Sequence, residues 1–174
     1  MNLLYDIDPG TKDEMNVIIE IPKDSHNKYE IDKATGLIKL DRANYSAAAY
    51  PFDYGFVPQT LWDDGDALDV IVLATYPVAV GVLVEARPVG LLAMVDNGDA
   101  DDKIIAVPVN DLRWAEVQDL TDVNKHTLKE IQDFLETYKN LKGKPAKVEI
   151  KGFKGRAEAE AAFERARKLY DEKK

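Results

Sequence analysis

The sequence contains no cysteine and only two histidines in 174 residues. The lack of cysteine excludes disulfides, thiolate zinc sites and cysteine nucleophiles. His26 and His126 do not have the spacing of a zinc-binding pair, and neither Ser25 nor Ser46 lies in a nucleophile elbow. No G-x-x-x-x-G-K-[ST] segment is present, so a P-loop is excluded as well.

Long apolar runs and a basic charge balance are also missing. No run of 18 apolar residues occurs, so we expect no membrane-spanning helix. Residues 1–16 lack a basic start followed by an apolar core, which predicts no signal peptide and a cytoplasmic location. The formal net charge of −9 argues against nucleic-acid binding, because phosphate backbones attract basic surfaces. The length predicts a single domain over residues 1–174.

The apolar pattern predicts mostly strands in the first two thirds of the chain and helices after them. The predicted strands cover residues 15–22, 26–32, 36–42, 68–75, 81–96, 103–109 and 146–153. A turn ending at Gly36 makes a hairpin of the second and third strands. Spacings of three and four predict a helix over about 124–140 and another toward the C-terminus; their apolar faces contain Leu128, Ile131, Leu135 and Tyr138, and Ala159, Phe163, Ala166 and Tyr170. This pattern predicts a mainly β fold, a small closed or nearly closed barrel with helices outside.

An unusual density of aspartates precedes one predicted strand, in the segment "DDGDALDVIV". A turn at Gly65 explains Asp64 or Asp66, but not Asp69, which opens a run of β-branched residues. Magnesium explains the set, because it binds one or two carboxylates and keeps water or phosphate oxygens in its other positions. A second acidic run follows another strand, at residues 96–102. Both runs could meet at one metal site, or both could be exposed acidic loops.

An EF-hand does not explain either acidic run. That calcium-binding loop needs a glutamate at its twelfth position between two helices. Frames that start at Asp64 and Asp96 place Thr75 and Val107 there, and both runs adjoin predicted strands.

Other polar residues stand at ambiguous positions. Lys28, Glu30 and Asp32 share one face of their strand, and this face could line a cavity or meet solvent. Glu20 interrupts an apolar strand, for which an edge bordered by solvent is the slightly favoured explanation. Residues 41–60 form a predicted loop that is rich in aromatics. Its Phe52 and Phe56 are expected in a local core, whereas Arg42 and its tyrosines, Tyr45, Tyr50 and Tyr54, could bind an oxyanion.

These residues occur within an ordered series of motifs: "IEIP", "KYEIDK-x-x-G", "YP-x-x-YGF-x-P-x-T", "DGD-x-x-D", "RPVG", "DDKI-x-AV" and "YK". The series resembles the soluble inorganic pyrophosphatases of family I from about Glu20 to Lys139, and "AKVEIKGF" and the final helix are in keeping with it. The resemblance implies an OB-like five-stranded β-barrel with peripheral helices. It also implies magnesium-dependent hydrolysis of pyrophosphate to two phosphates, and a homo-oligomer, namely a hexamer.

The resemblance also implies roles for individual residues. Asp66 would accept the proton of the attacking water, and Asp69 would bridge two metal ions. The metal-binding residues would be Asp64, Asp69, Asp101 and Asp96, with Glu20 and Glu30 acting through water. The phosphate-binding residues would be Lys28, Arg42, Tyr54, Lys103, Tyr138 and Lys139. Asn97 departs from the pattern, since bacterial members often have glutamate there, and this affects only a secondary contact.

Two alternatives belong to other functional classes. OB-like barrels also bind nucleic acids or oligosaccharides, against which the acidic balance and the lack of a basic aromatic face weigh. The second alternative is a metal-binding relative without catalytic activity. The complete set of acidic and basic residues argues against it. For the assembly, the helix over 124–140 is a candidate interface, and packing of Leu128 and Ile131 within the subunit is an equal alternative.

Overall fold

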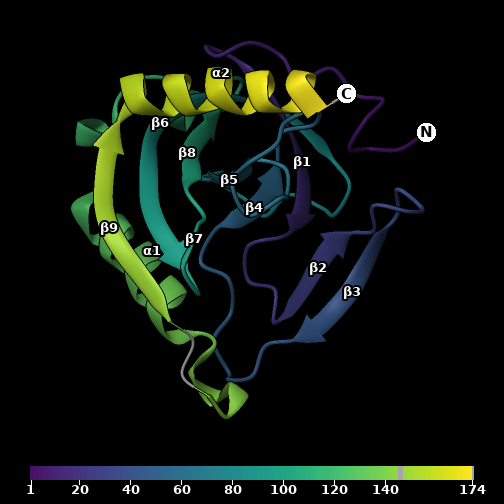
Figure 1. Ribbon diagram of the computed structural model, residues 1–174. Coiled ribbons are helices and arrows are strands. Elements are labelled where there is room, and N and C mark those ends of the chain that lie inside the picture. Colours follow the sequence, from purple (N-terminus) through teal and green to yellow (C-terminus); the bar gives the residue numbers. More distant parts are fainter. Residues whose placement is uncertain (145–146, 174) are drawn as a thin grey trace.

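Five strands of the chain close into a ring. The computed structural model describes residues 1–144 and 147–173. Around the ring the strands follow the order β1 (Met15–Ile21), β4 (Asp53–Phe56), β5 (Asp69–Val72), β8 (Lys103–Pro108) and β6 (Leu83–Asp96), which pairs again with β1. Only the β5–β8 pair is parallel among the neighbours in this ring. The predicted mainly β fold with an OB-like five-stranded barrel is confirmed (Figure 1).

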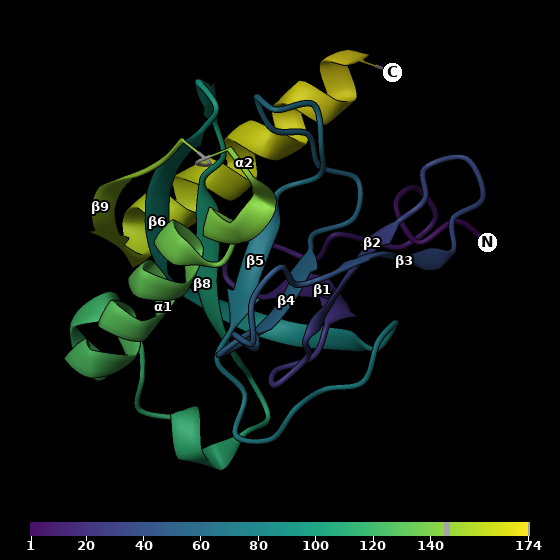
Figure 2. The ribbon, with the colours of Figure 1, turned by 90° about the horizontal axis from the view of Figure 1, so that it is seen from below.

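The remaining strands extend the ring or stand beside it. β7 (Asp99–Ala100) and β9 (Val148–Gly155) both pair with β6. The predicted hairpin is formed by β2 (Asn27–Ile31) and β3 (Ile38–Ala43), a separate two-stranded sheet to one side of the ring (Figure 2). Gly36 in its turn has a φ of 73°, which glycine adopts without strain. The strand predicted over residues 146–153 begins at Val148, and Ala146 lies outside the described residues.

Two helices cover the barrel. α1 (Lys125–Thr137) lies outside the ring beside β9, and α2 (Arg156–Lys173) crosses the ends of β6, β8 and β9 (Figure 1). Both predicted helices are thus confirmed. Short 3₁₀ helices occur at Leu112–Trp114, Leu120–Asp122 and Asn140–Lys142. No helix within the described ranges is long and apolar enough to cross a membrane.

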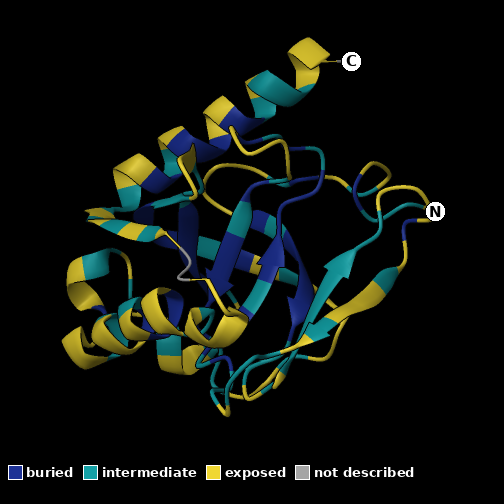
Figure 3. Ribbon diagram, turned by 60° about the horizontal axis from the view of Figure 1, so that its bottom comes forward, coloured by how far each residue is buried: buried dark blue, intermediate teal, exposed yellow. Residues whose placement is uncertain are grey.

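Alternate residues of the ring strands pack on opposite sides. In β5, Val70 and Val72 belong to the core cluster that includes the apolar face of α2, whereas Ile71 packs with α1. Both faces of these strands are therefore covered, which explains their nearly continuous apolar sequences (Figure 3). Ile131 of α1 is buried in the cluster that contains Ile71, and Leu128 packs against this cluster. The apolar face of α1 is thus used within the subunit.

The ring closes through a strand that the sequence did not predict. Residues 41–60 were expected to form a loop, but β4 lies among them, between β1 and β5. A Cβ atom at Gly55 would collide with the carbonyl oxygen of Ile18, so only glycine allows β1 and β4 to approach this closely. With four residues, β4 is too short to show alternation. Phe52 and Phe56 are buried, as predicted.

Candidate active site

A cavity of about 560 Å³ lies between the ring, the β2–β3 hairpin and the end of α1. Every residue to which the resemblance assigns a role, except Arg42, lines it: Glu20, Lys28, Glu30, Tyr54, Asp64, Asp66, Asp69, Asp96, Asp101, Lys103, Tyr138 and Lys139. Carboxylic acids outnumber lysines along its wall. The two acidic runs of the sequence therefore meet at one site.

Lys103 lies at the centre of this arrangement. The parallel pairing of β5 with β8 sets Asp69 opposite Lys103. The ammonium of Lys103 lies 2.9 Å from Asp69 Oδ2 and 2.9 Å from Asp101 Oδ1, and its side chain is only 5% exposed. Tyr54 donates a hydrogen bond of 2.5 Å to Asp69 Oδ2 and accepts one of 2.7 Å from Lys103. A buried cation is thus held by two carboxylates and a phenol.

Burial changes the protonation of these groups. It raises the pKa of Asp101 to about 7, an effect that the charge of Lys103 opposes. Burial also raises the pKa of Asp64. For Lys103, burial lowers the pKa, but attraction to Asp69 and Asp101 outweighs burial, so the pKa rises and the amine stays charged. The cavity therefore favours a positive charge among its carboxylates.

Glu20 lines the cavity and is not a solvent-facing interruption of β1. It is 7% exposed and accepts a hydrogen bond of 2.7 Å from the backbone N–H of Ile31 in β2. Burial, followed by repulsion from Asp69, raises the pKa of Glu20 to about 8. The interpretation of a strand edge bordered by solvent is wrong. Strand β1 is instead paired on both sides, and Glu20 connects it to the hairpin.

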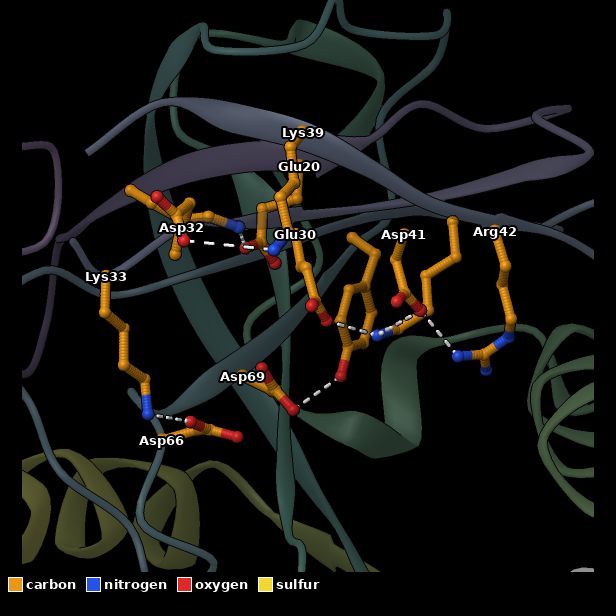
Figure 4. Close-up of polar contacts among 12 residues, drawn as sticks. Glu20, Glu30, Asp32, Lys33, Lys39, Asp41, Arg42, Asp66 and Asp69 are labelled. Carbon is orange, nitrogen blue, oxygen red and sulfur yellow. Dashed lines mark hydrogen bonds and ion pairs between the residues drawn. The ribbon is translucent and has the colours of Figure 1, made fainter. Parts of the chain in front are cut away.

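The charged face of β2 lines the cavity, which decides between the two alternatives for this strand. Lys28 forms an ion pair of 2.7 Å with Glu30 and one of 3.4 Å with Asp41 of β3 (Figure 4). On the opposite face, Tyr29 and Ile31 pack against the core. One face of β2 therefore lines the cavity, and the other packs against the core.

Arg42, to which the resemblance assigns phosphate binding, does not line the cavity, and neither does Tyr45. Arg42 pairs with Lys28 across the hairpin, and its guanidinium lies 2.6 Å from Asp41 (Figure 4). The guanidinium also lies over the ring of Tyr45, 5.2 Å from its centroid. The Nε of Arg42 is buried and has no hydrogen-bond partner among the described residues. The guanidinium thus lies next to the cavity, where Asp41 also contacts Lys28.

The end of α1 brings two further predicted residues to the cavity. Tyr138 stacks on Phe134, with ring centroids 4.7 Å apart. Lys139 forms an ion pair of 2.7 Å with Asp96 Oδ2, at the end of β6. The other oxygen of this carboxylate, Asp96 Oδ1, is buried and unpartnered within the described ranges.

Sequence reasoning assigned no role to several residues that line the cavity. Lys33 forms an ion pair of 2.5 Å with Asp66, and Lys39 also lines the cavity. The strand predicted over residues 26–32 stops before Lys33, and β2 ends at Ile31, so strand alternation gives no direction for this side chain. The only signal was its place in the "KYEIDK" motif.

The carboxylates are arranged as a magnesium site requires, and not as a site in which protein side chains alone enclose the ion. Within the described ranges, no three acidic or histidine side chains are grouped closely enough to enclose an ion. Magnesium does not need such a group, because it keeps several waters and binds through one or two carboxylates plus phosphate oxygens. The candidate metal ligands are all carboxylate oxygens, and among the described residues Asp96 Oδ1 lacks the partner that a buried oxygen requires.

Comparisons with known proteins agree with this geometry. The family model described as inorganic pyrophosphatase matches residues 17–171. The chain belongs to the inorganic pyrophosphatase family. The inorganic pyrophosphatase of Leifsonia xyli subsp. xyli is 52% identical over 83% of the chain and 88% of the relative, and that of Haloferax volcanii is 45% identical over 99% and 98%. The crystal structure of the Thermus thermophilus inorganic pyrophosphatase superposes with a TM-score of 0.94 at 43% identity, covering 98% of this chain and 99% of that one. Divalent metal ions are the cofactors of this family.

Proposed function

We propose that this chain hydrolyses pyrophosphate to two phosphates, with magnesium as its metal ion. The observation that carries the proposal is the meeting of both acidic runs and the lysines in one cavity of a chain of this family. Asp64, Asp69, Asp101 and Asp96 would hold the ions directly, and Glu20 and Glu30 through water. When bound, magnesium supplies positive charge that offsets the acidic wall and lowers the pKa of water.

The chain's own residues account for the proton and for the charge on the phosphates. Asp66 accepts a proton from the attacking water, whose oxygen forms the new bond to one phosphorus. The bridging P–O bond breaks, and the bridging oxygen leaves with the second phosphate. Lys28, Lys103 and Lys139 balance the charge on the phosphoryl oxygens, and the hydroxyls of Tyr54 and Tyr138 donate hydrogen bonds to them. Arg42 would add a bidentate contact from beside Lys28.

Phosphate release from pyrophosphate is the direct test. We expect rapid release with magnesium, none after the bound metal is removed with EDTA, and recovery when magnesium is returned. Asp66→Asn should release phosphate much more slowly than the wild type, and this control excludes a contaminating phosphatase. Undiminished hydrolysis in excess EDTA, after bound metal has been removed, would contradict the metal requirement.

For the assembly and location, we propose a homo-oligomer, a hexamer, in the cytoplasm. Exposed apolar side chains support self-association, since Tyr76 is 70% exposed and Val80, Val82 and Leu83 follow it on the same segment. Residues on the outer side of α1 could contribute, but its apolar face packs within the subunit. Light scattering that gives the monomer mass under dilute native conditions would rule the oligomer out.

A further inference from the structure

Lys33 connects the hairpin to the loop that carries Asp66. It follows β2, and its ammonium lies 2.5 Å from Asp66 Oδ1 (Figure 4). The same ammonium lies 3.2 Å from the carbonyl oxygen of Gly65. The proposed function gives this lysine no role. The hydrogen bond to Asp66 raises the pKa of Lys33, so the amine is charged in the neutral pH range.

The backbone around Asp66 is fixed, but its carboxylate is not. The N–H of Trp62 donates to the carbonyl of Asp66 at 2.7 Å, and the N–H of Gly65 donates to the carbonyl of Trp62 at 3.0 Å. The N–H of Asp66 donates to Asp64 Oδ1 at 3.0 Å. In the part of the chain that the structure describes, only Lys33 contacts the Asp66 carboxylate. Lys33 therefore supplies the polar contact that favours this orientation of the Asp66 side chain.

A contribution to stability does not explain the ion pair. The Lys33 side chain is 56% exposed and that of Asp66 60%, and screened pairs of this kind contribute about 0–1 kcal/mol. The second acceptor, on Gly65, instead gives the lysine two fixed points on the same turn. Two acceptors on one turn fix the direction of the Lys33 side chain, whereas they add little to the stability of the fold.

We propose that Lys33 is a positioning residue, which holds Asp66 Oδ1 so that Oδ2 is left to receive the proton of the attacking water. The inference rests on the proposed role of Asp66. Lys33 acts from outside the ring, so the β2–β3 hairpin contributes to aligning the base as well as to binding phosphate. Small errors in the placement of a reacting group reduce turnover by up to about 100-fold.

Kinetics of Lys33→Met, Lys33→Arg, Asp66→Asn and the double variant Lys33→Met/Asp66→Asn test the proposal at saturating magnesium. We expect Lys33→Met to lower kcat by about 10- to 100-fold, with KM and the magnesium midpoint within about twofold of the wild type. Arginine keeps the charge and a donor, so Lys33→Arg should recover much of kcat. In the Asp66→Asn background, Lys33→Met should lower kcat no further, because the carboxylate that Lys33 positions is already lost. Lys168→Met on α2 is the matched surface control, and unfolding temperatures should be similar throughout.

Three results would overturn the inference while leaving the proposed function intact. These are a wild-type kcat in Lys33→Met, an equal loss from Lys33→Met in the Asp66→Asn background, and a rise in KM or in the magnesium midpoint that accounts for the whole effect. A Lys33→Arg variant as slow as Lys33→Met would also count against it. By contrast, a fully active Asp66→Asn variant would refute the role of Asp66 itself, and with it the reason for positioning this residue.

Discussion

Lys139 and Asp96 form an ion pair of 2.7 Å that joins the end of α1 to the end of β6. The pair joins a lysine that is proposed to bind phosphate to a carboxylate that is proposed to bind metal. Two other lysines of the cavity are held in the same way: Lys103 by Asp69 and Asp101, and Lys28 by Glu30. A metal ion that takes over these carboxylates would release the lysines for the anion. Metal binding and substrate binding are therefore expected to be coupled.

Removal of the Lys139 charge should weaken catalysis without unfolding the protein. A lost charge-assisted contact costs about 1.5–3 kcal/mol, so Lys139→Ala should lower kcat/KM about ten- to hundredfold. Steady-state kinetics at saturating magnesium measure this effect. Lys168→Ala, on a side chain that is 79% exposed, should change kcat/KM very little. A Lys139→Ala variant as efficient as this control would remove Lys139 from the phosphate-binding set.

Asp69 and Asp66 should separate by role when each is changed to asparagine. Asp69→Asn removes charge from a proposed bridging ligand that also holds Lys103, so metal affinity and activity should fall together. Asp66→Asn should lower turnover and shift the pH profile of activity upward, since more hydroxide is needed when the base is absent. Its magnesium affinity should change less. Calorimetric magnesium titrations that show equal losses of affinity in both variants would contradict this division.

Glu20 should make the metal-free protein less stable as the pH rises. The pKa of Glu20 is about 8 in the folded chain against a usual 4.5, so the folded state holds a proton that the unfolded state has lost. The stability from this proton is complete below pH 4.5 and is lost as the pH rises through about 8. Glu20→Gln keeps an oxygen for the Ile31 N–H but cannot ionise. In EDTA at pH 9 it should therefore be more stable than the wild type, by roughly a few kcal/mol.

Urea unfolding of the wild type and Glu20→Gln between pH 5 and 9 measures this difference. Asp13→Asn is a suitable control, since Asp13 is exposed and does not line the cavity. A gap in unfolding free energy between wild type and Glu20→Gln that stays constant over this pH range would show that Glu20 does not titrate as its burial implies.

The sequence predicted most of the barrel and the acidic site, for reasons that particular residues make clear. The long ring strands appear in the sequence as apolar runs bounded by turns, and Asp69 was conspicuous because aspartate rarely opens an apolar strand. Strand β4 was not predicted, because it has only four residues and one of them is a glycine. Contact with Ile18 requires this glycine, and no local pattern in the sequence reveals that contact. Short elements set by tertiary contact are the least visible in sequence.

Side-chain partners were harder to predict than elements. Glu20 could not be placed from β1 alone, because its burial depends on β2, which crosses over it to donate the Ile31 N–H. Lys33 lies beyond the end of a strand, where the direction of a side chain follows from the turn rather than from period two. Such residues are fixed by parts of the chain that are distant in sequence.

Arg42 gives the sharpest test of how phosphate is held, because it lies beside the cavity rather than in its wall. Asp41 holds its guanidinium at 2.6 Å and also contacts Lys28, so a small movement of this pair toward the cavity would bring both cations to the anion. Arg42→Lys keeps the charge but loses the two parallel donors of the guanidinium. We expect kcat/KM to fall about ten- to hundredfold, with magnesium affinity unchanged. Hydrolysis kinetics beside the Lys168→Ala control check this expectation. Wild-type efficiency in Arg42→Lys would mean that Arg42 serves the β2–β3 hairpin through Asp41 and Tyr45, and that the lysines and tyrosines of the cavity hold the phosphates without it.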